Sequence, residues 1–155
     1  MEAYKPTEYL DFNDPKIAQQ QKDALDKVKS QLGKEYPNII EGKEVYTDKK
    51  TTSYNPANKS EIVGIFQKSG KEDAEKAINA AEKAFETWKY VPAKERADYL
   101  FKASELIKQR RLEINAWMIT EVGKNYLEAD ADTCEAIDFL EFYAREMIRL
   151  SENQP

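Results

Sequence analysis

Histidine is absent from this sequence of 155 residues, and cysteine occurs once, as Cys134. The chain therefore has no imidazole to act as a general base or metal ligand, and no cluster of histidine and cysteine that could bind zinc. We predict no metal site. A lone cysteine forms no internal disulfide, which agrees with a reducing compartment, so we expect a cytoplasmic protein.

Glycine is also scarce, and the five glycines occur one at a time. Neither G-x-x-x-x-G-K-S/T nor G-x-G-x-x-G is present, so the chain lacks two common loops that hold phosphate groups. Binding of a nucleotide cofactor by this chain alone is therefore not expected.

Long apolar runs are missing as well, since none approaches the ~20 residues that span a bilayer. The first ten residues lack the basic-then-apolar order of a signal peptide. The 24 basic and 29 acidic residues, with a net charge of -5, interleave instead of forming a basic stripe. We expect no membrane segment and no nucleic-acid partner.

What the sequence does contain is 41% hydrophobic and 11% aromatic residues, spaced as in regular local structure. Asp14 followed by Pro15 predicts the start of a helix that ends at Gly33. From Pro37 to Gln67, short β-prone runs separated by turns at Glu41–Gly42 and Asn55–Pro56 predict β-hairpins.

The second half of the chain predicts helices. Residues 69–72 fit a capping box with Ser69 as the N-cap, and a helix with one apolar face follows to about Tyr90. A second helix follows the break at Val91–Pro92, ends in the basic cluster 108–111, and leads to a third that stops at Gly123. This segment is therefore predicted to be mainly helical with short antiparallel β-hairpins, an α+β arrangement.

Several segments together resemble the N-terminal region of aldehyde dehydrogenases, most closely the branch that oxidises 1-pyrroline-5-carboxylate, through L-glutamate γ-semialdehyde, to glutamate. No single segment is a catalytic signature, so the resemblance depends on their order along almost the whole chain. The segments are Tyr54–Ala57, Glu61–Gly64, Ala74–Trp88, Glu95–Ala97, Glu121–Asn125, Glu128–Asp132 and Glu135–Arg145.

The resemblance implies an α/β, aldehyde dehydrogenase-like fold for the complete protein, of which this chain is a single incomplete domain. We expect an N-terminal extension with a helix over 1–36, a β-hairpin region over 37–68, the helical part of the N-terminal, NAD-binding domain over 69–150, and a tail over 151–155. The partners implied are the remainder of the polypeptide, a second copy in a homo-oligomer, and a small aldehyde substrate.

The resemblance also implies the chemistry. A complete enzyme of this family attacks the aldehyde with a cysteine thiolate, passes hydride to NAD and hydrolyses the thioester with a glutamate base. None of those groups matches a residue of this chain, so the chain alone is predicted to be inactive. Cys134 does not match the family's nucleophile, and next to Glu135 in the middle of a helix it is predicted to be a small packing residue.

Glu135 is the one candidate binding residue. Its neighbours three and four positions away are Ala131, Asp132, Asp138 and Phe139, so no lysine or arginine of its own helix neutralises it. The resemblance implies that an acid at this position binds the α-ammonium group of glutamate semialdehyde. A solvated surface acid is the alternative interpretation, and the sequence leaves both open.

The other acids of this segment, Glu128, Asp130, Asp132 and Asp138, are interpreted as residues of the first turns of a helix, favoured by the positive end of its dipole, and not as a cation site. For the chain as a whole, two alternatives stand beside the enzyme. One is a free-standing, non-catalytic helical interaction module derived from the family. The other is the corresponding segment of a fusion with proline dehydrogenase, which the start at Met1 disfavours.

Overall fold

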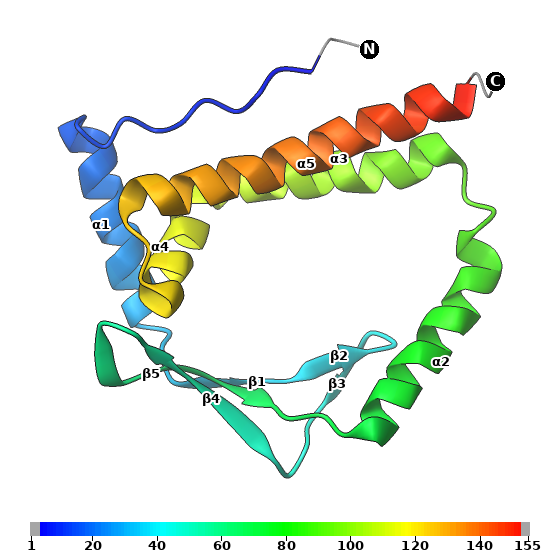
Figure 1. Ribbon diagram of the computed structural model, residues 1–155, viewed down its shortest axis with the longest axis horizontal. Coiled ribbons are helices and arrows are strands. Elements are labelled where there is room, and N and C mark those ends of the chain that lie inside the picture. The colour runs from blue at the N-terminus through cyan, green and yellow to red at the C-terminus, as the bar shows by residue number, and fades with distance from the viewer. Residues whose placement is uncertain (1–3, 153–155) are drawn as a thin grey trace. The chain divides into compact units, whose positions relative to one another are not determined.

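The computed structural model describes residues 4–152 and divides the chain into two compact units (Figure 1). The first, here called the helical unit, comprises the described residues up to Ser30 and from Pro92 onward. The second, here called the strand unit, spans Gln31–Val91.

The helical unit contains α1 (Pro15–Lys29), α3 (Ala93–Gln109), α4 (Arg111–Val122) and α5 (Tyr126–Glu152). Helices α3 and α5 run antiparallel and side by side, and α4 packs against both α1 and α5 (Figure 1). Most of the buried apolar side chains are small, which lets the helix backbones approach closely. The buried apolar residues of this unit are Val28, Ala97, Ala116, Ala129, Cys134, Ile137 and Ala144.

Local hydrogen bonds set the helix ends. The Asp14 carboxylate accepts the Lys16 amide at 2.8 Å, so the predicted start of α1 is confirmed. Gly123 ends α4 in the left-handed conformation with φ 76°, as predicted. The Asn125 side chain then accepts the Glu128 amide at 2.9 Å and begins α5. Helix α1 stops at Lys29, earlier than the predicted stop at Gly33.

The strand unit holds two small sheets. In the first, β5 (Asn58–Gln67) lies between β1 (Lys34–Tyr36) and β4 (Lys50–Asn55). The second is a hairpin of β2 (Asn38–Ile40) and β3 (Lys43–Val45). The predicted antiparallel hairpins are confirmed in β2–β3 and β4–β5. The parallel pairing of β1 with β5 was not predicted.

The turn between β2 and β3 contains two residues with positive φ, Glu41 at 52° and Gly42 at 73°. Two successive positive φ angles are the geometry of the tight turn that matches the twist of paired strands. The predicted turn at this position is therefore confirmed.

Helix α2 (Lys71–Trp88) is the last element of the strand unit. The N-cap predicted for this helix was wrong. Gly70 is the cap, and its amide donates to the Asp73 carboxylate at 3.1 Å. Ser69 does not cap the helix, because its hydroxyl oxygen accepts a hydrogen bond from the Asn38 side chain at 2.6 Å. A contact distant in sequence has replaced the local one.

The apolar face of α2 is exposed within this unit. No residue of the helix is buried, and the side chains of Ile78 and Phe85 are each 59% exposed. An amphipathic helix of this kind is stabilised mainly by covering its apolar face. Within the strand unit that face is not covered.

The predicted boundaries group α2 with the helices that follow it, whereas the structure groups it with the strands. How these units form domains of a complete protein stays a prediction. Helix α5 continues through Ser151 to Glu152, so the predicted tail begins inside the helix, and 153–155 lie outside the described residues.

Candidate functional site

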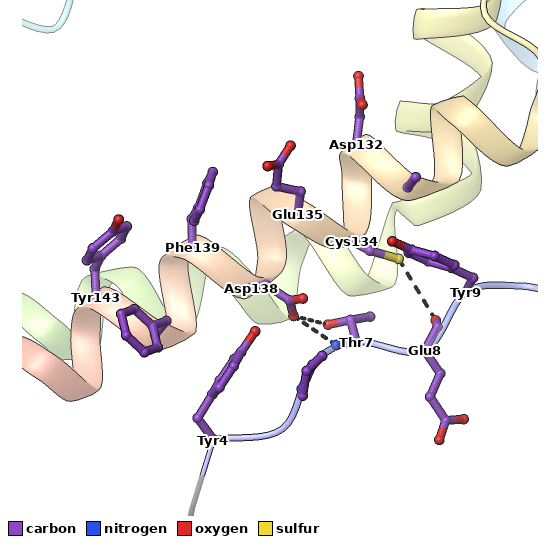
Figure 2. A pocket seen from close by; sticks show the side chains of 13 residues that line it. Tyr4, Thr7, Glu8, Tyr9, Asp132, Cys134, Glu135, Asp138, Phe139 and Tyr143 are labelled. Atoms are coloured by element: carbon purple, nitrogen blue, oxygen red, sulfur yellow. Dashed lines mark hydrogen bonds between the residues drawn. The ribbon is translucent and has the colours of Figure 1, made fainter.

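A cavity of about 800 Å³ lies in the helical unit, between α5 and the extended segment 4–10. Figure 2 shows this segment running beside the helix. The lining combines aromatic rings with polar and acidic groups, among them Tyr4, Thr7, Tyr9, Glu135, Asp138 and Phe139.

Hydrogen bonds and a ring contact hold the segment against α5. The backbone amide and the hydroxyl of Thr7 both donate to one carboxylate oxygen of Asp138, at 2.9 and 2.7 Å (Figure 2). The Tyr4 ring meets the Phe142 ring edge-on, with centroids 5.5 Å apart. One wall of the cavity is thus fixed to the helix that forms the other.

A buried ion pair secures the same segment further along. Asp130 is fully buried and accepts two hydrogen bonds from the Arg111 guanidinium, at 2.7 and 2.6 Å. The Asn115 side chain donates to it at 3.0 Å and the Leu10 amide at 2.8 Å. The guanidinium nitrogen Nη2 of Arg111, which also binds Asp130, donates to the Glu8 carbonyl oxygen at 2.9 Å. The pair therefore joins α4, α5 and the extended segment.

The pKa of Asp130 is lowered in this setting. Burial raises the pKa of the carboxyl, but the Arg111 hydrogen bonds, together with those from Leu10 and Asn115, outweigh that effect. Asp130 is therefore a charged structural residue.

The sequence patterns do not predict this pair. The sequence predicts Asp130 among the acids in the first turns of a helix and Arg111 at the end of the preceding helix, whereas Arg111 begins α4. That assignment was wrong for Arg111, although Lys108 does lie in the last turn of α3. An acid in the second turn of a predicted helix, near an arginine of the preceding one, was the available signal.

Cys134 lies in the packed interior, as expected, and is only 1% exposed. Burial raises the pKa of its thiol to about 11. The Arg111 guanidinium nitrogen Nη2 lies 2.9 Å from the sulfur, but its positive charge does not offset the effect of burial on the pKa. A thiol of that pKa is protonated at neutral pH, which agrees with a packing role and not with a nucleophile.

The other acids of α5 near the cavity have partners within the helical unit. Asp132 pairs with Lys124, and Asp138 is held by Thr7. Further along, Glu141 accepts hydrogen bonds from Lys108, Ser104 and Arg145. No group of three or more acids, cysteines or histidines arranged to hold a metal ion occurs among residues 4–152.

Glu135 differs from these acids. It is exposed on the cavity lining, and no hydrogen bond or ion pair to another described residue is found for it. In Figure 2 its carboxylate points to the same side of α5 as Asp132 and Phe139, away from the segment 4–10. The structure thus agrees with the environment deduced from the sequence, an acid without a cation on its own helix.

Comparison with known proteins places the chain in a family. The model of the aldehyde dehydrogenase family matches residues 44–154, which is more than half of the chain. The chain belongs to the aldehyde dehydrogenase family.

Within this family, two curated relatives are similar over nearly the whole chain. The 1-pyrroline-5-carboxylate dehydrogenase of Geobacillus thermodenitrificans is 45% identical over 155 residues, 100% of this chain and 30% of that protein. The 1-pyrroline-5-carboxylate dehydrogenase 2 of Bacillus subtilis is 47% identical over 152 residues, 98% of this chain and 30% of that protein. This aldehyde dehydrogenase chain therefore spans about 30% of the length of the relatives that it matches.

Solved structures give the same result for the fold. A Thermus thermophilus 1-pyrroline-5-carboxylate dehydrogenase variant is 39% identical with a TM-score of 0.97, covering 100% of this chain and 30% of that one. The Thermus enzyme with bound NAD is 40% identical with a TM-score of 0.95, covering 98% of this chain and 30% of that one. The aldehyde dehydrogenase-like fold predicted for the complete protein is confirmed by these neighbours.

The glycines are isolated, and no glycine-rich turn leads from a parallel strand into a helix among residues 4–152. The described part also contains no helix long and apolar enough to cross a membrane.

Proposed function

We propose that this chain is the N-terminal part of a 1-pyrroline-5-carboxylate dehydrogenase, which oxidises L-glutamate γ-semialdehyde to L-glutamate in proline breakdown. The support is the naming of relatives 45–47% identical over 98–100% of the chain. The chain supplies about 30% of their length, and the remaining polypeptide would supply the catalytic groups. The isolated chain is therefore expected to be inactive.

The proposed cofactor of the complete enzyme is NAD, since a 40% identical Thermus relative was solved with NAD bound. Because no glycine-rich phosphate loop occurs among residues 4–152, we assign the cofactor contacts to the rest of the polypeptide. A cytoplasmic location and a homo-oligomeric assembly are further parts of the proposal, and neither depends on the site described above.

Glu135 carries the proposed role of this segment in substrate binding. The observation behind it is that neighbouring acids of α5 are held by partners, while Glu135 lines the cavity and has no hydrogen bond or ion pair to another described residue. The α-ammonium group of glutamate semialdehyde would provide the missing cation through a charge-assisted hydrogen bond.

Such a contact would select among aldehydes. A hydrogen bond to a charged group contributes about 1.5–3 kcal/mol, which corresponds to a factor of roughly 10 to 150. Simple alkyl aldehydes cannot form it. The contact would therefore favour the amino-acid aldehyde without changing the oxidation itself.

The test uses the complete polypeptide and measures NADH formation with glutamate semialdehyde and with propanal. We expect Glu135→Gln to lower kcat/KM for glutamate semialdehyde about tenfold or more and to leave propanal unchanged. Glu146→Gln, which removes an acid of α5 outside the cavity, should change neither value. Equal losses on both aldehydes would contradict the role of Glu135.

A free-standing interaction module is the second candidate, and the exposed apolar face of α2 favours it. The two candidates predict different gene sequences downstream of the Pro155 codon. A reading frame that continues into a cysteine-bearing catalytic region supports the enzyme. A stop codon there, with a monomeric and well-folded chain, supports the module.

A further inference from the structure

Phe139 lies beside Glu135 at the same cavity. The two residues are four positions apart on α5, so they are neighbours on one face of the helix. Both line the cavity, and Figure 2 shows their side chains directed to the same side of α5. Phe139 is 51% exposed although it is a large apolar residue.

Other rings orient the Phe139 ring. Tyr143, one turn further along α5, lies with its centroid 5.8 Å from that of Phe139 and the ring planes 33° apart. Tyr143 in turn meets Phe142 edge-on at 5.4 Å. The three rings form an aromatic cluster that continues from the position of Glu135 along the helix.

A carboxylate and an aromatic face favour the same kind of ligand. The face of an aromatic ring carries negative charge density, so it attracts cations and gains nothing from a neighbouring carboxylate. An ammonium group has three N–H donors, of which one can bind a carboxylate while the others approach a ring face. The pair Glu135 and Phe139 therefore has the chemistry of a small ammonium site.

We propose that Phe139 is a second binding group for the substrate's α-ammonium, acting through a cation–π contact beside the hydrogen bond that the ammonium donates to Glu135. This inference rests on the proposed function, because it concerns the same site and the same ligand. Phe139 would distinguish an amino-acid aldehyde from its deamino counterpart because the face of its ring attracts the ammonium group. Glu135 makes the same distinction through the charge of its carboxylate.

The experiment measures binding, so it does not depend on turnover. Isothermal titration of the complete polypeptide gives dissociation constants for L-glutamate and for glutarate, which lacks the ammonium group. We expect Phe139→Leu to raise the dissociation constant of L-glutamate about two- to fivefold and to leave that of glutarate unchanged. Phe139→Trp should keep or strengthen the preference for L-glutamate, because tryptophan is the best cation–π partner.

Two further variants separate this inference from the proposed function. Phe85→Leu, an equally conservative change at an exposed phenylalanine of the strand unit, should alter neither constant. If Glu135→Gln lowers the preference for L-glutamate while Phe139→Leu does not, the inference fails and the proposed function stands. If neither variant changes the preference, both fail. If Phe139→Leu weakens the binding of L-glutamate and of glutarate equally, Phe139 has a packing role and the inference is overturned.

Discussion

Asp130 is the residue at which the extended segment, α4 and α5 meet. Its carboxylate binds Arg111, Asn115 and the Leu10 amide, so it fixes one wall of the cavity to the helix that carries Glu135. Removing one member of a buried ion pair leaves the other charge buried without compensation, and the energetic effect is correspondingly large.

We predict that Asp130→Asn lowers the free energy of unfolding of this chain by about 3–5 kcal/mol, measured by urea denaturation. The matched control is Asp132→Asn, two positions along the same helix, where the aspartate side chain is 44% exposed and pairs with Lys124. That change should have an effect below about 1 kcal/mol. Similar losses in the two variants would contradict a structural role specific to Asp130.

Acid should weaken the helical unit, because the pKa values of Asp130 and Glu141 are both lowered. Burial raises the pKa of each carboxyl, but hydrogen bonds led by those from Arg111 to Asp130 and from Lys108 to Glu141 outweigh it. Both groups therefore contribute stability that is fully present above their unfolded pKa values of about 4. That stability is lost as the pH falls through the lower folded values.

Urea denaturation at a series of pH values tests this expectation. The free energy of unfolding should change little between about pH 7 and 6 and fall below about pH 4. In Asp130→Asn the fall should be shallower. A fall of the same steepness in that variant would assign the acid sensitivity to other groups.

The sequence predicts the environment of Glu135 but not the partners of Asp130. The neighbours of Glu135 follow from helical spacing alone, and they are as expected. The Asp130 contacts join residues 19 and 120 positions apart in sequence. Periodicity contains no information about contacts of that kind, because they depend on how the helices pack.

At the scale of elements, the exposed apolar face of α2 contrasts with the buried face of α5. Ile78 of α2 is 59% exposed, whereas Ile137 of α5 is fully buried. The sequence pattern predicts that α2 is amphipathic, but it does not indicate which part of the protein covers the apolar face.

These two isoleucines give a matched pair of substitutions. Ile137→Ala should lower the free energy of unfolding of this chain by about 2–5 kcal/mol through a cavity in the core. Ile78→Ala should change it by less than about 0.5 kcal/mol, with both values measured by urea denaturation. A large loss from Ile78→Ala would show that the α2 face is already covered in this chain.

Elements fixed by local chemistry were predicted well. The Asp14 cap of α1, the Gly123 stop of α4 and the turn at Gly42 each depend on a few adjacent residues. The β1–β5 pairing was missed because it joins Lys34 to Gly64 across the intervening hairpin. The Ser69 cap failed for the same reason, since its hydroxyl is taken by the distant Asn38.

At the scale of the whole molecule, the chain is a member of the aldehyde dehydrogenase family that spans about 30% of its curated relatives. The exposed face of α2 and the Glu135 carboxylate, which has no cation partner among the described residues, both agree with a segment that is completed by other parts of a longer polypeptide. We therefore propose that the remainder carries out catalysis and that α5 recognises the substrate's ammonium group.

The most direct test compares glutamate semialdehyde with its deamino analogue, glutarate semialdehyde, as substrates of the complete polypeptide. The two aldehydes differ only in the α-ammonium group. We predict that kcat/KM of the wild type favours glutamate semialdehyde by about tenfold or more and that Glu135→Gln removes most of this preference. A wild type that oxidises both aldehydes equally well, or a preference that Glu135→Gln leaves intact, would contradict it.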